Sequence, residues 1–178
     1  MRSDLKVKAL PAVNIKILFR FLILSGLAVL FPAWFHNQWI TGPLINAILF
    51  LSVYLIGSRN ALLICLLPSV IALYFGLLPS PLAPLVPFIM FANVLLVITF
   101  DWLKNNYWVA VVVSALIKFL FLYLTSSAVI NLILKKSLSL KISQMLSWPQ
   151  LVTALLGGII VGGLLKVYKL KSHENTNY

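Results

Sequence analysis

The run from Tyr107 to Leu134 constrains this chain most, because it is continuously apolar apart from one charged residue, Lys118, near its middle. A helix of about 20 apolar residues is long enough to cross the hydrocarbon core of a bilayer. A lysine at that depth costs about 3 kcal/mol on insertion scales, so ionisable residues there tend to be functional. We therefore expect a membrane-spanning helix, with Lys118 as the first candidate functional residue.

The composition excludes an ordinary soluble domain. Of the 178 residues, 62% are hydrophobic and only 10% are charged, which leaves too little polar surface to keep a folded domain in water. The net charge of +11 lies almost entirely at the chain ends and in loops. Lysine and arginine in those places are typical of topology signals and contacts with membrane lipid, and no nucleic-acid-binding motif accompanies them.

Six apolar runs predict an all-α membrane protein with six transmembrane helices in a compact bundle. The predicted helices cover residues 17–35, 43–56, 61–78, 85–100, 107–134 and 149–167. They form a single domain, 17–167, between a basic tail, 1–16, and a basic and polar tail, 168–178. We expect Pro68 to kink the third helix and free a backbone carbonyl. The four prolines in 78–87 predict a stiff loop, and the loosely amphipathic loop 135–147 is expected to lie along the interface.

Lysine and arginine also predict the orientation. With the N-terminus in the cytoplasm, ten of these residues fall on the cytoplasmic side and only Lys135, Lys136 and Lys141 fall outside. The excess of basic residues on the cytoplasmic side places both termini there. The three outer lysines are either exceptions to the rule or an outward-facing basic patch.

In that orientation, polar residues collect in the outer half of the bundle, whereas the inner halves are aliphatic. This asymmetry predicts a polar cavity open to the outside, with Lys118 and Asn93 at its floor. The candidate substrate-binding residues are Lys118, Asn93, Asn46, Tyr74, Tyr123 and Gln150.

Lys118 has three possible environments: a ligand, backbone carbonyls or Asn93, or lipid. The acid nearest to a span, Asp101, lies at the cytoplasmic end of the fourth run, well below Lys118. If Lys118 is charged and faces the cavity, the ligand carries a carboxylate, phosphate or similar anion. Taken singly, Asn46 and Asn93 are more typical of hydrogen bonds between helices.

No catalytic, metal or cofactor site is expected. The single cysteine, Cys65, has no partner for a disulfide, and His36 is expected to contact lipid headgroups rather than a metal. One lysine without an acid, a serine–histidine pair or a metal cluster is a poor basis for catalysis, so the chain is not expected to be an enzyme.

The last run carries small residues four apart on one face: Ala154, Gly158 and Gly162. Such a face lets another helix approach closely. That helix belongs either to this bundle or to a partner protein.

Taken together, four stretches resemble the substrate-binding (S) component of energy-coupling factor (ECF) transporters. They are ITGPLINAILFLSVYLIGSRNALLICLLPSVIALYFG, PFIMFANVLLV, ALIKFLFLYL and WPQLVTALLGG, which cover most of residues 40–163. The chain is particularly similar to an S-component-like group labelled hydrogenase-associated membrane proteins.

This resemblance implies a prokaryotic cell-membrane protein that binds a vitamin- or cofactor-like small molecule in an outward-facing cavity. A transmembrane T component and two cytoplasmic ATPases would then supply the energy. The first run has Ser25, Gly26 and Ala28, but not the alanine-x-x-x-alanine pattern by which that family contacts its T component. This departure, with the group's label, supports an alternative hypothesis: a membrane anchor or assembly subunit of a redox complex such as a hydrogenase.

Overall fold

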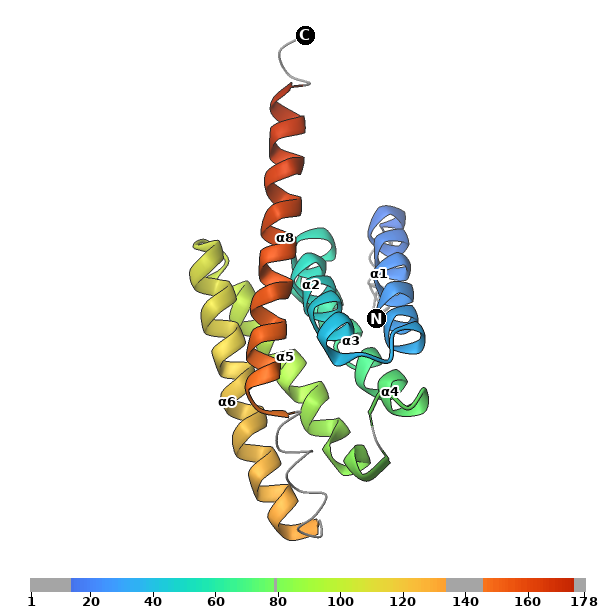
Figure 1. Ribbon diagram of the computed structural model, residues 1–178. Coiled ribbons are helices and arrows are strands. Elements are labelled where there is room, and N and C mark those ends of the chain that lie inside the picture. The colour runs from blue at the N-terminus through green and yellow to red at the C-terminus, as the bar shows by residue number, and fades with distance from the viewer. Residues whose placement is uncertain (1–13, 79, 134–145, 175–178) are drawn as a thin grey trace, which may run out of the picture.

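The computed structural model describes residues 14–78, 80–133 and 146–174, and within them every regular element is a helix (Figure 1). The helices are α1 (Ile15–Trp34), α2 (Gln38–Ile56), α3 (Ser58–Ile64), α4 (Leu67–Tyr74), the 3-10 helix η1 (Ser80–Leu85), α5 (Val86–Leu103), α6 (Tyr107–Ile133) and α8 (Trp148–Glu174). The prediction of an all-α protein is confirmed for these residues.

Five stretches are long and apolar enough to cross a membrane. They are Ile15–Trp34, Gln38–Ile56, Leu82–Leu103, Tyr107–Ser127 and Trp148–Tyr168. The third predicted helix corresponds to a shorter apolar stretch, Ser58–Tyr74, which contains α3 and α4. Several such helices in one chain are compatible with a multi-pass membrane protein.

The third predicted helix, 61–78, is interrupted in the structure. Cys65 caps the end of α3 and Leu66 precedes α4, which has Pro68 in its first turn. A proline fits there because it lacks the N–H that a helix interior needs. Helix α4 ends at Tyr74, close to Gly76, whose φ of 77° is a left-handed conformation that favours glycine.

Other helix ends also differ from the predicted ranges. Helix α2 begins at Gln38, five residues before the predicted start, because the Asn37 side chain accepts a hydrogen bond from the Trp39 N–H at 2.9 Å. Helix α5 continues through Asp101 to Leu103, and α8 continues beyond 167 to Glu174. Most of the predicted interfacial segment, 135–147, lies outside the described residues.

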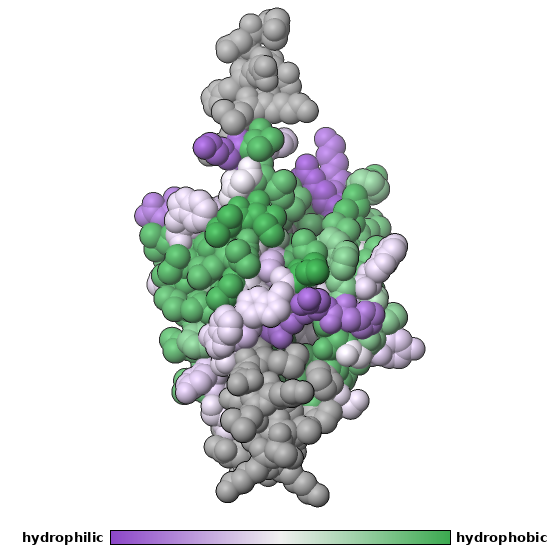
Figure 2. Space-filling view, in the orientation of Figure 1, coloured by the Kyte–Doolittle hydropathy of each residue, from purple (hydrophilic) through white to green (hydrophobic). Residues whose placement is uncertain are grey.

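Helix α2 is the centre of the bundle. Of the 18 residues in its most apolar stretch, 61% are buried, whereas only 17% are buried in the corresponding stretch of α1. It packs against α1, α3, α5 and α8. Figure 1 shows α5, α6 and α8 on one side of α2 and α1 on the other. The face drawn in Figure 2 is mainly hydrophobic, with a hydrophilic band at the level of the α1–α2 connection.

Candidate functional site

Lys118 lies in the interior, on α6, with 3% of its surface exposed. Its Nζ donates to Asn46 Oδ1 on α2 at 2.7 Å and to Asn93 Oδ1 on α5 at 2.8 Å. Because a lysine amine has only N–H donors to offer when it is protonated, each asparagine must face it with its amide oxygen. Of the three predicted environments, the structure places Lys118 against Asn93 and not against lipid.

The two asparagines are held by further hydrogen bonds. Asn46 Nδ2 donates to Gly42 O at 2.9 Å and, at 3.5 Å, to Thr153 Oγ1 on α8. Asn93 Nδ2 donates to Cys65 O at 3.4 Å, at the break between α3 and α4. We call these side chains, with the Cys65 carbonyl, the Lys118 network. It links α2, α5, α6 and α8 with the α3–α4 break.

A cavity of about 100 Å³ adjoins this network, and we call it the Lys118 cavity. Among the described residues, none that lines it is acidic. Its polar side chains are Lys118, Asn46, Asn93, Gln38, Thr41, Ser69 and Gln150, and its apolar lining includes Pro32, Ile45, Pro68, Ala72, Leu77, Leu78, Ile89 and Leu146. Asp101 does not line the cavity, and its carboxylate pairs with Lys104 at 2.9 Å at the end of α5.

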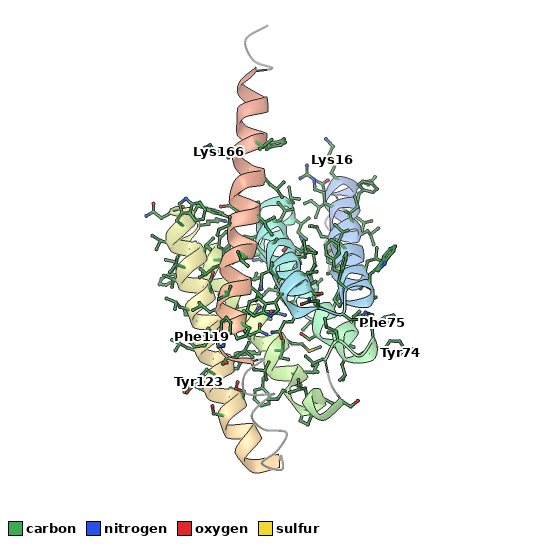
Figure 3. The ribbon with its side chains drawn as sticks, in the orientation of Figure 1. Lys16, Tyr74, Phe75, Phe119, Tyr123 and Lys166 are labelled. Carbon is green, nitrogen blue, oxygen red and sulfur yellow. The ribbon has the colours of Figure 1, made fainter. Side chains whose placement is uncertain are left out.

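The structure therefore brings together four of the six predicted substrate-binding residues, Lys118, Asn93, Asn46 and Gln150, in one cavity. The other two, Tyr74 and Tyr123, are not among its lining residues. Tyr74 is 82% exposed and its ring contacts Phe75, while Tyr123 is 47% exposed and its ring contacts Phe119. Figure 3 shows both tyrosines at the outside of the bundle.

The small residues of α8 pack inside the bundle. A Cβ added at Gly158 would overlap the Val111 side chain on α6, and one at Gly162 would lie 3.0 Å from the Tyr107 ring. Ala154 is fully buried in the main core. Neighbouring Gly157 lies against α2, where an added Cβ would come 2.8 Å from the Ala47 N. These contacts account for the spacing of small residues without a partner protein.

Three polar side chains of the cavity were not predicted as site residues: Ser69, Thr41 and Gln38. Thr41 and Gln38 lie in the first turn of α2, ahead of residue 43, where the sequence predicts that this helix begins. Ser69 follows Pro68. A proline inside an apolar run can mark the start of a new helix, and this was the sequence signal that could have identified Ser69.

Within the described residues, no group of three or more histidine, cysteine or acidic residues could hold a metal ion. His36 Nε2 lies 3.1 Å from the Phe75 carbonyl oxygen, just beyond the end of α4. This contact links the α1–α2 connection to α4.

Comparisons with known proteins found no match to a family model, to a curated protein or to a solved structure.

Proposed function

We propose that this chain is the substrate-binding membrane subunit of an uptake system for a small organic solute, of the ECF type that the sequence resembles. The observation that carries the proposal is a buried lysine beside a cavity whose described lining residues include no acid. A charge in the interior of a membrane bundle is costly to keep, so its retention favours a role in handling a ligand.

In the proposed topology the chain crosses the membrane six times, with α3 and α4 together making one crossing. Both termini then lie in the cytoplasm. Lys16 and Lys166 lie toward the same end of the bundle in Figure 3. Arg20 donates to Leu55 O near the end of α2, at 3.2 Å, so it also belongs to that end. A basic end of this kind is typical of the cytoplasmic side.

The Lys118 cavity would receive the solute from the opposite, outer side. Lys118, Asn46 and Asn93 form its polar floor, and Gln150 from α8 lines it as well. The sequence contains no Gly-rich phosphate loop, so energy would come from a T component and two cytoplasmic ATPases.

The proposal is tested by purifying the full chain from its own membranes and identifying, by mass spectrometry, the small molecules and proteins that remain bound. We expect an organic solute, together with a T component and two ATPases. Lys118→Met should reduce the retained solute at least tenfold, because it removes the central polar contact. Lys166→Met, which changes an exposed lysine on α8, should leave it unchanged.

A folded Lys118→Met protein that retains as much solute as the wild type would remove Lys118 from the site. Co-purification of a soluble redox enzyme, with no retained solute, would overturn the transport function and favour the anchor hypothesis.

A further inference from the structure

Ser69 is unusual among the buried hydroxyl groups of this bundle. It is 4% exposed, lines the Lys118 cavity, and its Oγ has no hydrogen-bond partner among the described residues. Serine and threonine inside helices normally donate to a carbonyl three or four residues earlier. Six others among the described residues do so: Ser52, Ser114, Thr125, Ser126, Ser127 and Thr153. Ser25 Oγ also has no partner within the described ranges, but Ser25 does not line the cavity.

Ser69 lies in the first turn after the α3–α4 break. The two backbone carbonyls that a helical serine normally uses belong here to Cys65, which accepts from Asn93 Nδ2, and to Leu66, and Ser69 Oγ bonds to neither. Among the described residues, the hydroxyl therefore remains available to a group in the cavity. A buried hydroxyl without a hydrogen-bond partner is destabilising, so a ligand that accepted a hydrogen bond from it would remove that cost on binding.

The start of α4 adds a favourable field for negative charge. Helix α4 has eight residues, no side chain caps its N-terminus, and Pro68 and Ser69 from its first turn line the cavity. The N-terminus of a helix carries a partial positive charge from its unsatisfied N–H groups. Helices interrupted within a membrane bundle present such ends to the anionic groups of transported solutes.

Lys118 supplies the second donor. A lysine ammonium group has three N–H donors, and Asn46 and Asn93 accept two of them. Both asparagine amide oxygens face Lys118, so neither is directed at a ligand. Since no acid lines the cavity in the described part of the chain, its floor offers hydrogen-bond donors to an anion and no counter-charge to a cation.

We infer that the floor of the Lys118 cavity is a carboxylate subsite, in which the Ser69 hydroxyl and the Lys118 amine each donate to one carboxylate oxygen. The inference rests on the proposed function, and it defines the solute class as an organic acid. The cavity volume, about 100 Å³, is below the roughly 300–1,000 Å³ of pockets that enclose whole drug-sized ligands. It suits a carboxylate and a short chain, with the rest of a larger solute extending outward.

The test uses the full chain in nanodiscs of zwitterionic lipid, with sodium butyrate as the probe. Butyramide has nearly the same shape without the charge, and inorganic phosphate is an anion of a different geometry. Binding is measured by saturation-transfer NMR, with empty nanodiscs to subtract partition into lipid. We expect butyrate to bind at least tenfold more tightly than butyramide or phosphate.

Ser69→Ala should weaken butyrate binding about tenfold, as expected for loss of one hydrogen bond to a charged group. Ser114→Ala is the matched control, because Ser114 is equally buried on α6 but donates to Val111 O and does not line the cavity. It should bind butyrate as the wild type does. Lys118→Met, provided that it folds, should abolish the preference for butyrate over butyramide.

Three results would overturn the carboxylate subsite: no butyrate binding by the wild type, equal binding of butyrate and butyramide, or unchanged butyrate affinity in Ser69→Ala. None of them refutes the proposed transport function, which is tested by the retained solute and the co-purified ATPases. Conversely, butyrate binding that depends on Ser69, in a protein without those partners, would preserve the subsite and refute the ECF assignment.

Discussion

At the scale of single residues, the molecule is organised around a lysine that is satisfied by amides rather than by an acid. The sequence predicted Lys118 and Asn93 together at the floor of a cavity, because both lie near the middle of long apolar runs. It indicated a hydrogen bond from Asn46 to another helix, but not that Asn46 accepts from Lys118 on α6 while donating to Thr153 on α8. Ser69 was missed because a serine in an apolar helix normally bonds its own backbone.

We expect Asn93→Leu to destabilise the protein by about 1–3 kcal/mol, since Lys118 would lose one of its two buried acceptors. Asn93→Leu should reduce the stability less in a protein that already carries Lys118→Met. Unfolding of the two single variants and the double variant in detergent measures this coupling free energy. Strictly additive effects of the two substitutions would show that the 2.8 Å hydrogen bond contributes nothing to stability.

At the scale of elements, apolar runs predicted where helices lie, but not which way their side chains face. In a helix whose lipid side and core side are both apolar, hydrophobicity identifies no inward face. For that reason Tyr74 and Tyr123 were assigned to the cavity, although the structure exposes both. The break at Cys65 and Leu66 was predicted only as a kink at Pro68. Pro68 has no N–H to donate to the carbonyl four residues earlier, so the interruption lies on the N-terminal side of the proline.

Small residues were the reliable signal on α8, and they lead to a prediction about packing. Gly158→Ala should destabilise the bundle by about 1–3 kcal/mol, because the added Cβ would overlap Val111. A second substitution, Val111→Ala, should restore part of that loss by making room. Thermal unfolding of the detergent-solubilised variants measures both effects.

The matched control on the same helix is Gly163→Ala, where an added Cβ would meet nothing within 4 Å. It should be neutral or slightly stabilising, because alanine favours a helix more than glycine does. If Gly158→Ala proved as harmless as Gly163→Ala, the close contact between α6 and α8 would not exist in the folded protein.

At the scale of the whole molecule, the proposed orientation assigns each connection between helices to one side of the membrane. Asn37, between α1 and α2, would face outward, and Asn105, between α5 and α6, would face the cytoplasm. Both residues are exposed, whereas the native Cys65 is fully buried, so the wild-type chain supplies an unlabelled background. A cysteine at either position therefore reports its side of the membrane to a maleimide that cannot cross lipid.

We expect Asn37→Cys to react with such a maleimide in intact spheroplasts, and Asn105→Cys to react only after the membrane is opened. Moving a basic loop, such as the one bearing Lys104, across the bilayer during insertion is unfavourable. Such loops therefore stay in the cytoplasm. The opposite pattern would invert the bundle. The Lys118 cavity would then face the cytoplasm, and a role in capturing solute from outside would be untenable whatever the cavity binds.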